Sequence, residues 1–192
     1  MAKNTLYLIG ILLTLSCLYS CKSKSKKWDN IANSMKKWEN FELQIKGIKA
    51  PFPKRPVQKS IAYSSDISFH QSYAEIDSVT FSVAIITNAA LKDAKSWHDF
   101  FTKEVLAFKS LEQKNIKVLG RDAVWSKVRE NDLCSYTINM VVDNNFVLNL
   151  GLRYKGDFPP EKLMLDFASK LKIEKYQLPS IAPPVVKDSI LE

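Results

Sequence analysis

Polar and apolar residues alternate along the middle of the chain in a pattern that predicts β-strands. Ile67 to Tyr73 and Val79 to Ile85 alternate residue by residue, which is typical of strands with one buried face. Asp77-Ser78 lies between them and predicts a turn. Further strands are expected over 57–64, 116–128, 133–142 and 146–154, with a bulge or bend at Gly120 and a hairpin turn at Asp143-Asn144-Asn145.

Two segments repeat their apolar residues at helical spacing. Residues 91–112 carry one wide apolar stripe, with Asn88 as a candidate cap and Asp93 in the first turn. Residues 160–172 predict a closing helix. Strands joined by short turns form an antiparallel sheet, and amphipathic helices must bury their stripes on it. We therefore predict an α+β fold, with an antiparallel β-sheet covered by two amphipathic helices.

The segments around this pattern complete the expected domain organisation. The proline-rich stretch 48–56 is read as an extended turn region, and the proline-containing tail 176–192 as extended or disordered. Earlier in the chain, Trp28, Ile31, Met35 and Trp38 fall on one face of a helix. That face either packs on the domain, which we favour, or lies in the membrane interface. The expected units are a signal peptide (1–20), a tether with a short helix (21–45), one domain (46–175) and the tail (176–192).

The first residues have the layout of a bacterial export signal. Lys3 precedes an apolar run from Leu6 to Leu15, and a small, polar segment then ends at Cys21. Leu18 and Ser20 take matching positions, so the segment resembles a lipobox. That resemblance implies cleavage before Cys21 and attachment of diacylglycerol to its sulfur, with labelling by palmitate. An ordinary secretory signal is the alternative, and Cys17 fits the lipobox pattern less well.

The residues after Cys21 are strongly basic. Lys22, Lys24, Lys26 and Lys27, together with Trp28, are candidate contacts to an anionic membrane. A hydrophilic spacer is the competing interpretation. Lysines stand where some exported lipoproteins carry an acidic signal, which favours a lipid-anchored protein on the outer membrane of a bacterial envelope, facing the periplasm.

Composition limits the classes of partner. The 192 residues carry a formal net charge of +8, and several of these charges lie in the tether, so the domain is only mildly basic. A mildly basic domain behind an export signal argues against nucleic-acid binding. The expected partners are the membrane, through the N-terminal lipid, and an unidentified protein. Cys134 has a strand-like context, and its default interpretation is a buried, inert thiol.

No pattern in the sequence indicates a catalytic, metal or cofactor site. The two histidines show no metalloprotease spacing, with His98 beside the helical stripe and His70 expected to face solvent. We therefore predict no catalytic residues, no metal and no cofactor, and read the acidic pairs Glu75/Asp77 and Glu130/Asp132 as solvated turn residues. Possible partner contacts are Lys54 and Arg55 in the proline-rich loop, and Arg153-Tyr154-Lys155 at the end of the last strand.

The order of elements from Pro51 to Ile173 resembles a known fold family. It comprises Phe52-Pro53-x-x-Pro56, three strands, a long helix, a strand with Gly120, a hairpin and a final helix, and it is similar to the PsbP and Mog1-like fold. That resemblance implies a non-enzymatic accessory or binding protein of the envelope. The alternatives are an immunity protein against a toxin delivered into the periplasm, and a hydrolase with an unrecognised site.

Overall fold

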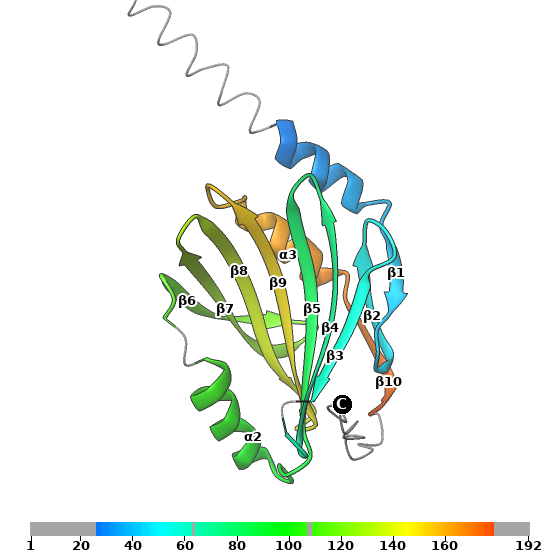
Figure 1. Cartoon of the computed structure of the whole chain (residues 1–192), viewed down its shortest axis with the longest axis vertical. Helices are drawn as coiled ribbons and strands as arrows, with labels where there is room; N and C mark the ends of the chain where they lie inside the picture. The colour runs from blue at the N-terminus through cyan, green and yellow to red at the C-terminus, as the bar shows by residue number, and fades with distance from the viewer. Residues whose placement is uncertain (1–25, 63, 107–108, 179–192) are drawn as a thin grey trace, which may run out of the picture.

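Antiparallel β-structure dominates the computed structural model, which describes residues 26–62, 64–106 and 109–178 (Figure 1). The larger sheet has seven strands, with β3 and β6 at its edges. Its strands in spatial order are β3 (Val57–Ala62), β4 (Ile67–Ile76), β5 (Val79–Asn88), β9 (Phe146–Lys155), β8 (Leu133–Val142), β7 (Arg121–Glu130) and β6 (Glu112–Val118).

A smaller sheet joins the two ends of the described chain. Strand β2 (Lys46–Phe52) lies between β1 (Glu39–Glu42) and β10 (Lys172–Gln177) and is antiparallel to both. Gly47 takes a positive φ of 90°, and a Cβ there would lie 2.4 Å from the Lys175 carbonyl oxygen. Only glycine fits this close approach of β2 to β10.

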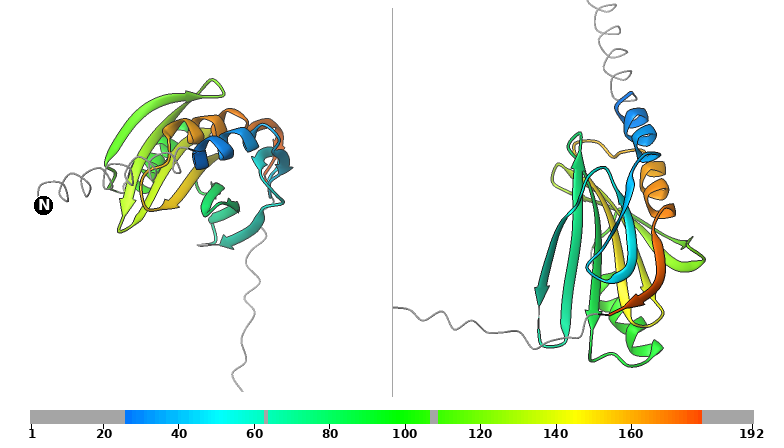
Figure 2. Two further views of the ribbon diagram at one scale, coloured as in Figure 1. Left: turned by 90° about the horizontal axis from the view of Figure 1, so that it is seen from above. Right: turned by 90° about the vertical axis from the view of Figure 1, so that its right-hand side faces the viewer.

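Three helical segments accompany the sheets. The first covers residues 26–35 and lies next to α3 (Glu161–Ser169), as Figures 1 and 2 show. Helix α2 (Ala94–Phe100) lies at the opposite end of the molecule and continues into one turn of π-helix, η1 (Phe101–Val105). The Asp93 side chain caps α2 by accepting a hydrogen bond from the Ser96 amide at 2.9 Å.

The main core lies between the large sheet and α3. Residues directly opposite each other on neighbouring strands share a face, so the register assigns each strand residue to one side of the sheet. On the α3 side, Phe81 meets Phe167 with ring centroids 5.2 Å apart. The other side, which we call the groove face, contains Ser82, Ala84 and Ile86 of β5.

The helix at residues 26–35 belongs to this core. Ile31 and Met35 are buried, and the rings of Trp28 and Trp38 pack edge-on against Tyr154 and Phe81. The tryptophan face therefore packs on the domain. Leu43 and Ile45 are buried as well, so the core begins N-terminal to residue 46, the predicted domain start. The physical reason is that four large apolar side chains before residue 46 are shielded from water only by packing against the sheets and α3. They are Ile31, Met35, Leu43 and Ile45.

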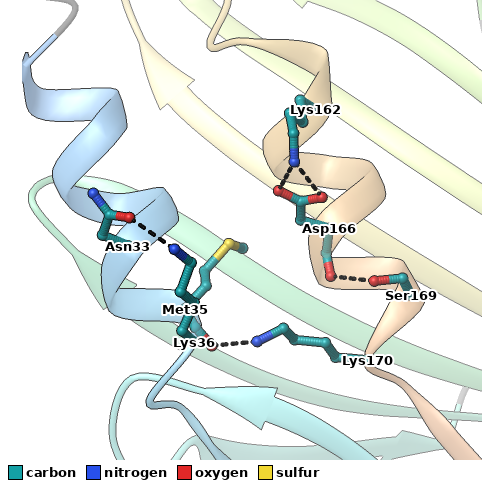
Figure 3. A network of polar contacts seen from close by, with 7 residues as sticks. All are labelled: Asn33, Met35, Lys36, Lys162, Asp166, Ser169 and Lys170. Carbon is teal, nitrogen blue, oxygen red and sulfur yellow. Dashed lines mark hydrogen bonds and ion pairs between the residues drawn. The ribbon is translucent and has the colours of Figure 1, made fainter.

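One long side chain ties this helix to α3. The Lys170 ammonium group, just after α3, donates a hydrogen bond to the Met35 carbonyl oxygen at 2.5 Å (Figure 3). Met35 is the last residue of the helix at 26–35, where carbonyl groups lack a partner within the helix. A cation at that end also complements the helix dipole. The other contacts in Figure 3 are local: Asn33–Lys36 at the end of the first helix, and Lys162–Asp166 and Ser169–Asp166 within α3.

The α+β class is confirmed, with mainly antiparallel sheet. The predicted strand at 133–142 matches β8, and the expected turns at Asp77-Ser78 and Asp143-Asn144 both take positive φ. The closing helix is also present, as α3.

Several predicted elements are wrong in detail. The helix expected over 91–112 is reduced to α2 and η1, its cap is Asp93 in place of Asn88, and Glu112 already begins β6. Leu119 and Gly120 take positive φ and make a hairpin turn, so the expected bulge separates two strands, β6 and β7. Much of the proline-rich stretch 48–56 is strand, because β2 continues to Phe52.

The C-terminal tail and His70 also differ from expectation. Tyr176, expected to begin the extended tail, lies in β10 and packs edge-on against Phe146. His70 does point away from Phe69, but toward the α3 side of the sheet, where it is half-buried and not in solvent. Its Nδ1 is 2.9 Å from the Ser60 hydroxyl on the neighbouring strand.

Candidate functional site

A groove crosses the face of the large sheet opposite α3, beside η1. Its volume is about 620 Å³, within the range of ordinary small-molecule sites. Phe100, Glu104 and Val105 line one wall from α2 and η1, and the sheet forms the floor. We call this feature the sheet groove, and its lining residues are Ile67, Phe69, Ile86, Phe100, Glu104, Val105, Val128, Glu130, Leu133, Ser135, Thr137, Asn149 and Arg153.

The groove exists because small side chains occupy the centre of this face. Ser82, Gly151, Thr137 and Ser126 stand in one row across β5, β9, β8 and β7. A Cβ on Gly151 would lie 2.5 Å from the Ser82 hydroxyl oxygen, so glycine lets this serine occupy the row. The sheet is therefore hollowed where larger residues would fill the space beneath η1.

Hydrogen bonds hold the polar part of the floor in place. The Asn149 amide donates to the Asn139 Oδ1 at 2.6 Å, and the Asn139 amide donates to the Thr137 hydroxyl at 3.4 Å. Asn139 is fully buried, whereas Thr137 and Asn149 line the groove. This arrangement leaves the Thr137 O–H as a donor and the Asn149 carbonyl as an acceptor for a bound molecule.

Next to this floor, one further hydroxyl has no partner. The Ser126 Oγ is fully buried on the same face, opposite Thr137. It makes no hydrogen bond with any residue that the structure describes. A buried hydroxyl without a partner is costly and calls for an explanation. It lies beneath the floor and does not line the groove.

Charged side chains stand at one end of the groove. Arg153 lies opposite Ser135, and Glu130 lies opposite Leu133 on the neighbouring strand pair. Glu104 contributes a second carboxylate from η1. Within the described part of the chain, none of these three side chains has an ion-pair partner. They are free to contact a ligand.

The wall formed by η1 is itself unusual. A π-helical turn inserts an extra residue into a helix and is found frequently at functional sites. Here Phe101 and Val105 are buried, and Val105 lines the groove together with Phe100 and Glu104. The π-turn thus places apolar and charged side chains together over the polar floor.

A second pocket of about 650 Å³ lies on the other side of η1. Its lining includes His98 and Thr102, but its charged pair, Arg121 and Asp143, is already engaged at 3.2 Å. The pocket therefore lacks free charged groups of the kind that the sheet groove offers. We take the sheet groove as the candidate site.

The predicted membrane contacts are only partly within the described residues. Cys21, Lys22 and Lys24 lie outside them. Lys26 is exposed, and the Lys27 ammonium lies 4.0 Å from the centroid of the Tyr154 ring and 4.9 Å from that of Trp28. Lys27 and Trp28 are thus engaged with the end of β9.

The predicted partner contacts lie far apart. Lys54 and Arg55 are exposed after β2, where Arg55 borders a shallow pocket with Glu42 and Gln58. Of the second group, only Arg153 lines the sheet groove; Lys155 pairs with Asp132 at 3.0 Å. Glu130, expected as a solvated turn residue, belongs to β7 and the groove.

The nucleophilic and basic side chains considered from sequence do not meet. Cys134 is fully buried, as predicted, and its thiol donates to the Gly156 carbonyl at 2.8 Å. His98 is exposed on α2, and burial lowers the pKa of His70. None of the three lines the sheet groove. The sequence did not single out Thr137 or Asn149; their only signal is a polar residue within an otherwise apolar strand.

Comparison of the chain with protein-family models and with curated proteins gives no match. Among the residues that the structure describes, no helix has the length and apolar character to cross a bilayer.

Proposed function

We propose that the protein is a lipid-anchored binding protein of a bacterial envelope, which holds a ligand in the sheet groove and does not catalyse a reaction. The observation that carries this proposal is the groove itself: a polar, hydrogen-bonded floor, apolar lining residues, and three charged side chains without an ion-pair partner among the described residues. Apolar walls with a few placed polar groups are the usual design of a ligand site.

The side chains of the groove favour binding over catalysis. Its hydroxyls, Ser135 and Thr137, have no histidine beside them, since neither His70 nor His98 lines the groove. A serine or threonine nucleophile needs an adjacent base to become reactive. The remaining groups can orient a ligand but supply no activated nucleophile among the described residues.

The proposal attaches the domain to the membrane through Cys21. The lipobox pattern supports this attachment, and the basic residues that follow support a position near anionic headgroups. We also propose that the arrangement of sheet and helices is a PsbP/Mog1-like sandwich, in which the order of elements is the supporting observation. The preferred location remains the periplasmic side of the outer membrane.

Photo-crosslinking in living bacteria tests the binding role. A benzoylphenylalanine replaces Ser135 in the groove of the full-length protein, and in a matched control it replaces the exposed Ser169 at the end of α3. After irradiation, we expect a covalent adduct from position 135 and none from position 169, measured by intact mass. The absence of an adduct at 135, or equal adducts at both positions, would contradict the binding role.

A further inference from the structure

The sheet groove changes character from one end to the other. Its apolar end holds Phe69 and Ile86, which lie in one row with Val147 of β9, and its charged end holds Arg153 of the same strand. Val147 and Arg153 are six residues apart, which corresponds to roughly 20 Å at about 3.4 Å per residue. Asn149 and Thr137 lie between the two ends.

The charged end matches a head with both signs of charge. Arg153 presents a guanidinium, the donor group best suited to a phosphate or carboxylate. Glu130 and Glu104 present two carboxylates, so a simple anion would meet repulsion beside its attractive partner. A zwitterionic head satisfies both, with its anionic group on Arg153 and its ammonium group on Glu130.

The middle of the groove matches one polar linkage. The Thr137 O–H can donate to a carbonyl oxygen, and the Asn149 carbonyl can accept from a hydroxyl. An ester carbonyl and a neighbouring glycerol hydroxyl present this pair of groups. Beyond them, the side chains of Ile86 and Phe69 offer apolar contact.

An extended peptide fits this order of groups poorly. It would present an amide N–H and C=O at every residue along the 20 Å. Those groups would lose water against Phe69, Ile86 and Val105 without gaining hydrogen bonds, and each such loss is costly. A single acyl chain needs no hydrogen bonds over that stretch.

We propose that the sheet groove binds a zwitterionic single-chain phospholipid from the membrane to which the protein is anchored. Its phosphate contacts Arg153, its ammonium contacts Glu130, its ester and hydroxyl contact Thr137 and Asn149, and its acyl chain lies against Phe69 and Ile86. This inference rests on the proposed function, because it names the ligand of the same groove.

Titration calorimetry on the full chain tests the ligand class. The Cys21→Ala form removes any lipid of the protein's own, and the probe is lauroyl-lysophosphatidylethanolamine below its critical micelle concentration. We expect one molecule bound per chain. Arg153→Gln should weaken binding about tenfold, the usual effect of losing a charge-assisted hydrogen bond. The matched control Arg129→Gln should bind as the wild type, because Arg129 lies over the Phe158 ring on the other side of the sheet.

The choice of probes separates this inference from the proposed function. Lauroyl-lysophosphatidylglycerol, which lacks the ammonium, and lauric acid should each bind at least several-fold more weakly. Equal binding of all three probes, or wild-type affinity in Arg153→Gln, would overturn the ligand class. A groove that crosslinks from position 135 to a peptide or protein would also overturn it while retaining the binding role. Failure of every probe together with no crosslink at 135 would overturn both.

Discussion

At the scale of single residues, the sheet groove depends on side chains that are small or polar where β-strands usually carry large apolar ones. Gly151 and Ser82 leave space, while Asn139 and Asn149 hold each other in a fixed orientation. Such residues make fewer packing contacts on this face of the sheet than large apolar side chains would. They supply instead the hollow and the hydrogen-bonding groups of the groove.

The contact between Gly151 and Ser82 gives a stability prediction. Gly151→Ala places a methyl group 2.5 Å from the Ser82 hydroxyl oxygen, so the serine must move within a buried site. We expect a loss of roughly 1–3 kcal/mol in the free energy of unfolding, measured by urea denaturation. Ser82→Ala removes the clashing oxygen, and the double variant should recover most of the loss. A double variant as unstable as Gly151→Ala would contradict this explanation.

His70 gives a prediction of pH dependence. Burial lowers the pKa of its imidazole below the ordinary value of 6.5, so the unfolded chain binds more protons than the folded chain just below that pH. The stability that neutral His70 contributes to the folded state is therefore fully present above pH 6.5. It is lost as the pH falls toward the pKa that His70 has in the folded protein. Urea denaturation at pH 7.5 and at pH 5.5 measures the free energy of unfolding. This free energy should fall less between the two pH values for His70→Gln than for wild type. The exposed His98→Gln variant should follow wild type; a wild-type response from His70→Gln would refute the assignment.

At the scale of elements, the helix at residues 26–35 is fastened at both ends. Trp28 packs against Tyr154 near its start, and Lys170 holds the Met35 carbonyl at its end. These contacts join the N-terminal segment to β9, a strand of the large sheet, and to α3, which packs on that sheet. A membrane anchor before residue 26 would therefore be coupled to the folded domain through a docked helix.

Removing the Lys170 contact tests that coupling. Lys170→Met leaves the Met35 carbonyl without its charged donor, and we expect a loss of about 1–3 kcal/mol in the free energy of unfolding. Amide hydrogen exchange should rise first in residues 26–35. The matched control Lys162→Met breaks a surface pair with Asp166 within α3 and should cost well under 1 kcal/mol. Equal losses in the two variants would show that Lys170 does not fasten the helix.

Prediction from sequence succeeded at this scale where the signal was local. Alternation over 67–73 and 79–85 identified β4 and β5, and the strand expected over 133–142 is β8. It failed for β1, β2 and β10, and β10 pairs with β2 across more than 120 residues, as Lys172 and Lys49 do. The helix predicted from the apolar stripe over 91–112 is too long for a related reason. Strand β6, which begins at Glu112, pairs with β7, and this pairing outweighs helical propensity.

At the scale of the whole molecule, the candidate site follows from strand order, which no local pattern reveals. Ser82, Gly151 and Thr137 form one row but belong to three strands, β5, β9 and β8. The row therefore forms only when the β8–β9 hairpin pairs with β5. The sequence identified Arg153 as a surface candidate but could not place it in the same groove as Glu104. The proposed lipid anchor, by contrast, is predicted from a linear motif that ends at Cys21.

The anchor yields its own prediction. Labelled palmitate should enter the wild-type protein and the Cys17→Ala control but not Cys21→Ala, because lipidation takes place on the cysteine at the end of the lipobox. The measurement is fluorography of the protein immunoprecipitated from labelled bacteria. Label persisting in Cys21→Ala would refute attachment through this residue.

Native mass spectrometry decides whether the sheet groove holds a ligand in the cell. The full-length protein is purified from bacterial membranes as wild type, as Thr137→Trp, which fills the middle of the groove, and as Ser169→Trp on the exposed end of α3. We predict one non-covalently bound small molecule on the wild type and on Ser169→Trp, and none on Thr137→Trp. A wild-type protein without bound mass, or the same mass on all three proteins, would contradict the account.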